Sequence, residues 1–441
     1  MTDQQIVKLA RELLPQMDRL LGASAADAKR ELSWLLLQAE MEPEGIGPKI
    51  LELLGQYPAL RLWLGLKSGI AVQMVEPAGA ELDLRETTGA LPVAPAAAPP
   101  PAPSHKEAIQ RKLDRVRPNY QLVTIHYTTD RAASGSAVPS EFFTADRSAK
   151  GLMTYGTCDV SIPARHRKGE LESPCWKKLE FHQDPSKHIV LMQVTTLDPQ
   201  AFFARAGETG NQAFVFIHGF NVTFENAARR TAQIACDLPF DGLPVLYSWP
   251  SRGSETPLAY SADEATIEWT VPHLQAFLED LVEKSGVTTV HLIAHSMGNR
   301  ALTRALQLIA LRAPGKAVFH QVVLTAPDID AETFEDLAKS FLEVAQRVTL
   351  YASAEDLALK FSKTVHRQRR AGDAEGGVLV VDGMDSVDAT GVDTSFLGHS
   401  YFGSDKSVLT DLYYALQGES ASERKATIKL AGTGTYYEFV L

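Results

Sequence analysis

The 441-residue sequence predicts an α/β protein, with a mostly parallel, doubly wound sheet and a small all-α domain at the N-terminus. Two observations predict this: helical apolar spacing up to about residue 67, and, farther along, short apolar runs that alternate with helical segments. A proline- and alanine-rich stretch separates the two patterns. We therefore expect a helical domain at 1–84, a linker at 85–115 and an α/β domain at 116–441.

Composition narrows the classes of function. The formal net charge of -11 argues against nucleic acid or an anionic membrane as the main partner. Three cysteines are too few for a disulfide framework and favour a reducing compartment. The first 16 residues have neither an apolar signal core nor a membrane-spanning segment, so we expect a cytoplasmic protein.

The N-terminal domain is expected to be a small helical bundle. Its apolar positions recur at helical spacing in three groups, at 6–20, 32–39 and 50–54. Residues 91–104 then hold six prolines, a composition that forms an extended spacer rather than a core. The bundle could simply stabilise the main domain, but its place on a spacer favours an adaptor that binds a partner protein or self-associates through residues 1–70.

The α/β domain is expected to begin with antiparallel strands. Three β-rich segments at 120–127, 155–162 and 188–194 are separated by loops that contain glycine and proline. A repeating order of strand and helix follows, typical of a parallel sheet that carries its site at the carboxyl ends of the strands. The predicted strands of this part are 213–217, 243–248, 289–294, 321–326, 347–352 and 378–381.

Ser296 lies between the predicted strand 289–294 and a segment with helical spacing. A serine at such a turn, flanked by small residues, is typical of a nucleophile elbow, in which the strand and the helix nearly touch. Here Ala294 replaces the first glycine of the usual pattern, and Gly298 keeps the second. The alternative interpretation is an ordinary serine cap at a helix N-terminus.

A second loop carries the sequence His218-Gly219-Phe220-Asn221 after the strand at 213–217. Gly219 allows a tight backbone turn, so the amides of Phe220 and Met297 are predicted to form an oxyanion hole. The residues predicted to contact the substrate around this hole are His218, Gly219, Asn221 and His295.

The remaining catalytic residues are predicted from chain order. Asp356 and His399 follow the predicted strands 347–352 and 378–381, which gives the order serine, acid, histidine. The histidine accepts the proton of Ser296, and the carboxylate stabilises the imidazolium that forms. Asp328, which also follows a strand, is the alternative acid. The motifs require neither a metal nor another cofactor.

Seven segments resemble the bacterial α/β-hydrolases that are grouped as a domain of unknown function. The resemblance covers about residues 118–415 and implies the α/β-hydrolase fold, an esterase- or lipase-like triad at Ser296, Asp356 and His399, and an elbow that commonly begins with alanine. Residues 1–70 resemble, without a sharp motif, the small helical adaptor domains of bacterial signalling and conflict effectors. The seven segments are His126–Arg131, Tyr155–Pro163, Phe216–Asn221, Tyr247–Ser251, Ala294–Asn299, Pro327–Asp330 and Gly398–Phe402.

These features predict a serine hydrolase that cleaves small-molecule or lipid esters. About 20 residues separate the strand that ends near Ala326 from the strand at Arg347, which leaves no room for a helical lid there. We therefore expect an open cleft that accepts short or exposed acyl esters. Two alternatives remain: a phospholipase or lipase effector in a bacterial stress or defence response, and an inactive scaffold that keeps the fold.

Overall fold

The computed structural model divides the chain into two compact units, Met1–Arg111 and Lys112–Leu441. Asp356, His399 and the predicted linker at 85–115 lie outside the residues that it describes. The described residues are 3–14, 17, 32, 35–36, 46–56, 60, 119–174, 180, 182–253, 257–355, 359, 368–392, 406–425, 427–431 and 435–440.

The N-terminal unit contains the two described helices α1 (Asp3–Leu13) and α4 (Ile46–Gln56). The apolar stripe that the sequence predicts on α1 is buried, as Ile6, Ala10 and Leu13 are each at most 4% exposed. These side chains share one hydrophobic cluster with the buried face of α4. Helix α4 begins two residues before Pro48, so this proline occupies the first turn, where its missing N–H costs no hydrogen bond.

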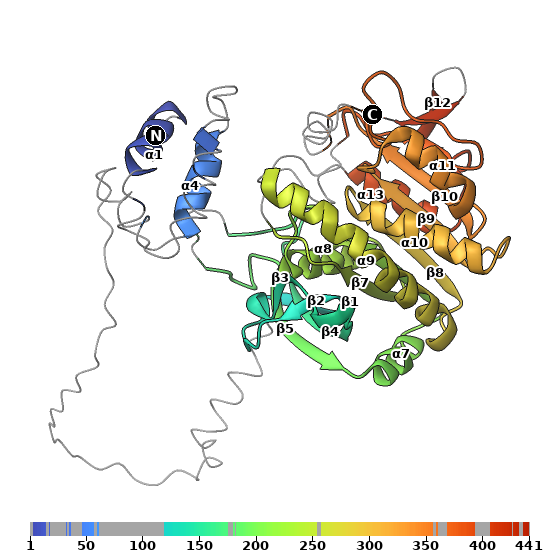
Figure 1. Cartoon of the computed structure of the whole chain (residues 1–441), viewed down its shortest axis with the longest axis horizontal. Helices are drawn as coiled ribbons and strands as arrows, with labels where there is room; N and C mark the ends of the chain where they lie inside the picture. The colour runs from blue at the N-terminus through green and yellow to red at the C-terminus, as the bar shows by residue number, and fades with distance from the viewer. Residues whose placement is uncertain are drawn as a thin grey trace, which may run out of the picture. The chain divides into compact units, whose positions relative to one another are not determined.

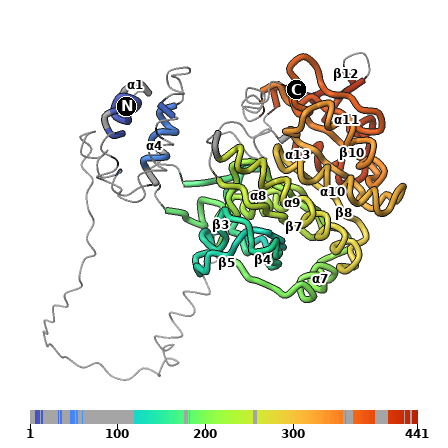
Figure 2. The backbone as a smooth tube through the Cα atoms, viewed as in Figure 1, coloured from blue at the N-terminus to red at the C-terminus, as the bar shows by residue number. Residues whose placement is uncertain are grey.

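The second unit is built on one large sheet, which has eleven strands among the described residues, in the order β12-β13-β11-β10-β9-β8-β6-β7-β1-β4-β5. The pairs β1·β4, β4·β5 and β12·β13 are antiparallel, and the other neighbours are parallel. In Figure 2 the colour passes from the teal of β4 at one side of the unit to the red of β12 at the other. The strands are β1 (Tyr120–Thr129), β4 (Thr154–Pro163), β5 (Val190–Leu197), β6 (Gln212–Ile217), β7 (Leu243–Ser248), β8 (Thr289–His295), β9 (Phe319–Thr325), β10 (Ala345–Ala352), β11 (Asp385–Asp388), β12 (Ile428–Ala431) and β13 (Tyr436–Phe439).

Helices cover both faces of this sheet (Figure 1), which confirms the predicted doubly wound α/β class. Successive side chains of β6 lie in two different hydrophobic clusters. This is expected because neighbouring side chains of a strand point to opposite faces of the sheet, and both faces are covered. One cluster contains side chains of α7 (Pro199–Glu208), α9 (Pro257–Lys284), α10 (Gly298–Arg312) and α11 (Ala331–Phe341). The other contains side chains of α8 (Phe224–Asp237) and α13 (Lys406–Leu416).

A short hairpin lies outside the main sheet. Its strands are β2 (Arg131–Ala133) and β3 (Phe143–Arg147), which pair antiparallel. The short helices η3 (Pro139–Glu141) and η4 (Ala149–Gly151) lie beside β3 in the sequence. Because β2 follows β1 directly, Arg131 lies just past the carboxyl end of β1.

The prediction of a strand at 378–381 is wrong. Val378 and Leu379 are buried but form no strand, and the parallel neighbour of β10 is the later segment Asp385–Asp388. The apolar run fills hydrophobic clusters as a loop, where it packs side chains without entering the ladder. The apolar composition of this run correctly indicated burial, but composition alone does not show whether a buried segment pairs as a strand.

The sheet order brings the loop after β6 beside the Ser296 turn. Ile217 of β6 pairs with Ala294 of β8 on one side and with Tyr247 of β7 on the other. The residues just beyond these strands, from His218 and from Ser296, therefore leave the sheet at one edge. The strand order thus places the two predicted loops next to each other.

Candidate active site

Ser296 occupies a sharp turn between β8 and α10. Its φ is +49°, which a residue other than glycine rarely adopts, and the side chain is buried. Left-handed backbone at this place is the strained geometry of a nucleophile elbow. A helix N-cap residue normally has extended backbone, so the conformation of Ser296 argues against the alternative interpretation as a capping serine.

The next strand holds this turn in place. The Ser296 amide donates to the Thr325 carbonyl at 3.0 Å, and the Asp328 amide donates to the Ser296 carbonyl at 3.3 Å. The side chain of Asn299 donates to the carbonyls of both Ser296 and Thr325, each at 3.0 Å. These bonds join the strained turn to the end of β9 and offset part of its conformational cost.

Two glycines allow the loops to approach each other closely. A Cβ atom on Gly298 would lie 2.4 Å from the His218 carbonyl oxygen. A Cβ atom on Gly219 would lie 3.0 Å from the Cβ of Ser296 and 2.9 Å from Nδ1 of His295. The loop after β6 therefore lies directly against the Ser296 turn, as the motif requires.

The predicted oxyanion amides lie in these two loops. Met297 is the residue before the first turn of α10, and Phe220 follows Gly219. Within the described part of the chain, neither amide donates to another backbone group. The Phe220 ring packs edge-on against Tyr260 of α9, with ring centroids 5.2 Å apart. An oxyanion hole needs two amides without such a partner, and this role of Phe220 and Met297 stays a prediction.

His218 is buried and engaged by the protein on both ring nitrogens. Its Nδ1 lies 2.9 Å from the Gly219 carbonyl oxygen, and its Nε2 lies 3.2 Å from the Ser248 hydroxyl. The ring stacks on Trp249, with a centroid distance of 5.2 Å. Burial, followed by the charge of Arg131, lowers the pKa of His218 to about 3 and keeps the ring neutral. The predicted substrate contact of His218 stays a prediction, because every contact described here is with the protein.

The other residues predicted to contact the substrate border the same turn. Asn221 has φ +60°, so it turns the chain from Phe220 toward the first turn of α8. His295 is buried beside Gly219. Their contacts with a substrate also stay predictions.

The alternative acid, Asp328, is buried in a network of its own. One carboxylate oxygen accepts from the Tyr260 hydroxyl at 2.5 Å and from Arg300 at 3.2 Å. The other oxygen lies 3.2 Å from Nε of Arg370. Both oxygens of Asp328 therefore already bind cations or donors, which favours a structural role for this carboxylate and leaves Asp356 as the preferred acid.

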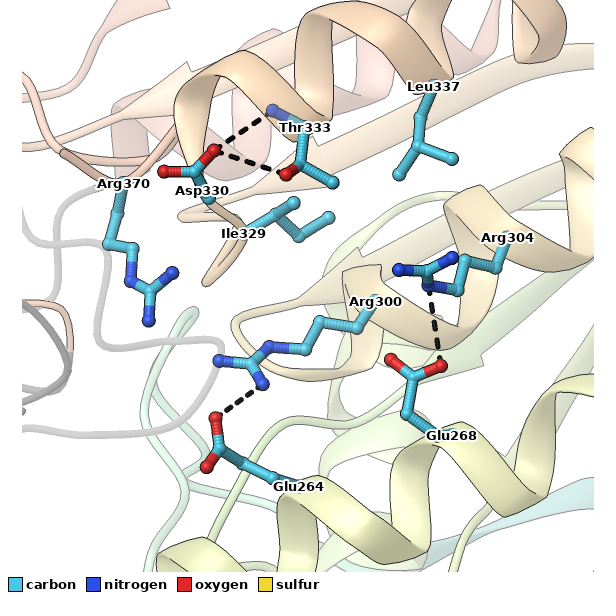
Figure 3. Close-up of a pocket in the computed structure, with 9 residues that line it drawn as sticks. All are labelled: Glu264, Glu268, Arg300, Arg304, Ile329, Asp330, Thr333, Leu337 and Arg370. Atoms are coloured by element: carbon cyan, nitrogen blue, oxygen red, sulfur yellow. Dashed lines mark hydrogen bonds and ion pairs between the residues drawn. The ribbon is translucent and has the colours of Figure 1, made fainter. Parts of the chain in front are cut away.

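A shallow cavity of about 160 Å³ lies beside this network (Figure 3). Ser296 is not among the residues that line it. Its walls hold three arginines and three carboxylates. Two ion pairs join α10 to α9 in this lining, Arg300 with Glu264 and Arg304 with Glu268. The lining is Glu264, Glu268, Arg300, Arg304, Ile329, Asp330, Thr333, Leu337 and Arg370. A lining with balanced charges selects neither an anion nor a cation, so we assign this cavity no ligand.

Comparison with known proteins finds a family that matches part of the chain. Residues 200–416 match the family described as "Alpha/beta hydrolase of unknown function (DUF900)". The predicted resemblance and the predicted fold are both confirmed. The α/β domain thus has the α/β-hydrolase fold, and the description of the matching family leaves the reaction open.

Solved structures with detectable likeness include esterases. Est1E from Butyrivibrio proteoclasticus, with bound ferulic acid, is 12% identical; the match covers 47% of this chain and 86% of that chain, with a TM-score of 0.30. A thermostable esterase from Pseudomonas putida ECU1011 is 14% identical over 70% of this chain and 88% of that chain, with a TM-score of 0.27. A search among curated proteins finds no match.

Two further findings concern the described residues only. None of their helices has the length and apolar character needed to cross a membrane. They also contain no group of three histidine, cysteine, aspartate or glutamate side chains placed to hold a metal ion.

Sequence reasoning missed the residues that hold the loop after β6. These are Arg131, Ser248 and Ser251, which contact that loop from the ends of β1 and β7. All three lie in segments that resemble the family, but their types alone predicted no role. The sheet order that makes them neighbours was the missing information.

Proposed function

We propose that this protein is a serine hydrolase that cleaves carboxylic esters through an acyl-enzyme on Ser296. The observation that carries the proposal is the left-handed turn at Ser296, packed against a glycine of the neighbouring loop. An ordinary strand-to-helix connection has no need of this strained serine.

In the proposed reaction the Ser296 hydroxyl attacks the ester carbonyl while His399 accepts its proton. The carbonyl oxygen becomes negatively charged and accepts hydrogen bonds from the amides of Phe220 and Met297. The protonated His399 then donates to the leaving alcohol, and Asp356 stabilises the imidazolium. Water, activated by His399, releases the acid from Ser296 in the second half of the reaction.

The connection between β9 and β10 supports a preference for short esters. It contains α11, a helix whose apolar face belongs to the main hydrophobic cluster. A helix packed in this way serves as a normal crossover between parallel strands. The proposal therefore keeps the expectation of an open cleft without a lid at this position.

Labelling with a fluorophosphonate probe tests the activated serine. We expect the full-length protein to be labelled, and Ser296→Ala and His399→Ala to lose labelling, because the probe reacts with a serine activated by a base. Ser161→Ala is a matched control, because Ser161 is also a buried serine, and its hydroxyl donates to the Val190 carbonyl, outside the loop after β6. Equal labelling of Ser296→Ala and wild type would refute the proposal.

A series of p-nitrophenyl esters from acetate to palmitate then defines the acyl group. We expect the highest kcat/KM on short chains, because no lid is available between β9 and β10. Activity confined to emulsified long-chain lipids would instead support the lipase alternative.

We further propose that residues 1–70 form an adaptor that places or regulates the enzyme. The separate hydrophobic cluster shared by α1 and α4 supports an independent unit. Labelling of a chain that begins at Lys112, compared with the full chain, tests regulation. Faster labelling of the shorter chain would indicate inhibition by the N-terminal unit, and equal rates would contradict regulation of this kind.

A further inference from the structure

Arg131 is a buried cation that reaches several parts of the candidate site. Its side chain is 2% exposed, and burial, only partly offset by Asp130 and Asp263, lowers its pKa to about 10, so it stays protonated at neutral pH. The guanidinium makes five polar contacts: with the Ser248 hydroxyl at 2.9 Å, the carbonyls of Thr144, Ser251 and Val222 at 3.2, 3.0 and 2.8 Å, and Nε2 of His218 at 3.4 Å.

These contacts determine which nitrogen of His218 carries the proton. The Gly219 carbonyl can only accept, so Nδ1 of His218, 2.9 Å away, must donate. A guanidinium can only donate, so Nε2 must accept from Arg131. The Ser248 hydroxyl accepts from Nε of Arg131 and is free to donate to Nε2 of His218 at 3.2 Å. All three partners favour the same neutral tautomer.

The tautomer in turn affects the neighbouring peptide. The Gly219 carbonyl and the Phe220 amide belong to one trans peptide, in which C=O and N–H point in opposite directions. A hydrogen bond that draws the Gly219 oxygen toward His218 therefore directs the Phe220 N–H away from His218. The backbone at Gly219 lies against Ser296, since a Cβ there would be 3.0 Å from the Cβ of Ser296.

The far end of the loop is held by contacts that do not involve His218. The Val222 amide donates to the Ser251 hydroxyl at 3.2 Å, and that hydroxyl donates to the Asp263 carboxylate at 2.7 Å. The Val222 carbonyl accepts from Arg131. A change at His218 therefore acts on the Gly219–Phe220 peptide, while Val222 keeps its anchor at Ser251.

We propose that Arg131, by holding His218 in the tautomer with the proton on Nδ1, fixes the direction of the Phe220 amide and makes both side chains positioning residues of the oxyanion hole. The inference rests on the proposed ester hydrolysis at Ser296. Neither side chain takes part in proton transfer; both orient the donor that stabilises the negative oxygen.

The tautomer can be measured without any turnover. Nitrogen-15 NMR of the full-length protein, with the His218 signals assigned by their loss in His218→Asn, should show protonated Nδ1 and unprotonated Nε2 at neutral pH. In Arg131→Met we expect a second population, protonated on Nε2, beside the one protonated on Nδ1, because Nε2 has then lost a partner that can only donate and Ser248 can accept from it. Protonated Nε2 in the wild type, or an unchanged tautomer in Arg131→Met, would overturn the inference.

Kinetics on p-nitrophenyl acetate test the consequence. His218→Leu removes the donor to the Gly219 carbonyl, so we expect kcat to fall on the order of 10²-fold, the scale of a lost oxyanion donor. KM should stay within about threefold, because the lost interaction belongs to the transition state. The amide of His218→Asn can place an N–H near the position of Nδ1, and should recover most of kcat. Equal losses of kcat in both variants would overturn the inference.

Arg229 provides a matched control for Arg131. It is 4% exposed and donates to the carbonyls of Ile189 and Glu172, away from the loop after β6. Arg229→Met should lower the melting temperature but keep kcat, whereas Arg131→Met should lower both. If the two variants lose kcat in proportion to their loss of melting temperature, positioning by Arg131 is refuted. A wild type that is inactive and unlabelled would refute the proposed function, and the NMR measurement would still decide the tautomer.

Discussion

Asp328 and Asp356 are the two aspartates proposed as the triad acid, and the surroundings of Asp328 favour a structural role for it. Asp328 is 2% exposed and bound by Tyr260, Arg300 and Arg370, so its charge already compensates buried cations. A triad acid instead needs a free lone pair for the N–H of the catalytic histidine. This difference predicts opposite results for the same isosteric substitution.

We expect Asp356→Asn to lower kcat by roughly 10⁴-fold and to change stability little, as the loss of a triad acid does. Asp328→Asn should instead lower the free energy of unfolding by roughly 3 kcal/mol, because it leaves Arg300 and Arg370 without their shared carboxylate. Denaturant unfolding and ester kinetics on both variants check this. The reverse pattern would identify Asp328 as the acid.

Gly219→Ala tests the close approach of the two loops. The new methyl group would lie about 3 Å from both Ser296 and His295, so the loop must move away from the turn. We expect kcat to fall at least tenfold, since a displaced amide no longer meets the developing oxyanion, with a loss of stability of about 1–3 kcal/mol. Unchanged kcat would show that the Phe220 amide is not an oxyanion donor.

The sequence contained enough information for the Ser296 turn but too little for Arg131. The turn is local: a short strand, a serine, Gly298 and a helix follow one another within a few residues. Arg131, by contrast, meets His218 across 87 positions of the chain. Such a contact depends on sheet order, which apolar periodicity does not determine.

Among the secondary-structure elements, the strands of the sheet centre were the most predictable. From β6 to β10 each strand is a nearly continuous apolar run, as expected for parallel strands covered on both faces. Strand β11 has the sequence Asp385-Ser386-Val387-Asp388, which lacks that signal. Its pairing comes from its position beside β10, and β12 and β13 were missed because each has only four residues.

His166, in the connection between β4 and β5, makes the stability of the fold depend on pH. This histidine lies 2.8 Å from Glu172 in the same connection and 2.9 Å from Asp237 of α8. Burial alone lowers the pKa of His166, but the hydrogen bonds to Asp237 and Glu172 outweigh burial and raise it to about 9. The protonated imidazole therefore joins this connection to the end of α8.

Because the pKa is higher in the folded state, protonated His166 stabilises the fold fully below pH 6.5, and this contribution is lost as the pH rises through about 9. The shift corresponds to roughly 3 kcal/mol of folding stability. Denaturant unfolding of the wild type between pH 6 and 10 should show this decline, and His166→Gln should flatten it. A wild-type curve as flat as that of His166→Gln would contradict the ion-pair interpretation.

For the whole molecule, the two compact units define separate hydrophobic cores. The clusters of the α/β unit contain no residue from α1 or α4, and the N-terminal cluster contains none from the sheet. Separate cores predict separate unfolding events.

Calorimetry of the full chain should therefore show two transitions, and a chain that begins at Lys112 should keep only the larger one. The enthalpy of unfolding scales with the number of residues, so the α/β unit should account for most of the heat. Limited proteolysis should first cut within the predicted linker, residues 85–115. A single transition that is lost as a whole in the shorter chain would contradict independent folding.

The order of strands also affects how this protein is made. Strand β13 lies between β12 and β11, so the outer edge of β11 lacks its neighbour until residues as late as Phe439 have left the ribosome. Among the described strands, no edge of the sheet gains its neighbour later in synthesis than this one, and an open edge can recruit foreign strands. Dependence on a chaperone should thus extend to the final segment, well after the serine turn has been synthesised.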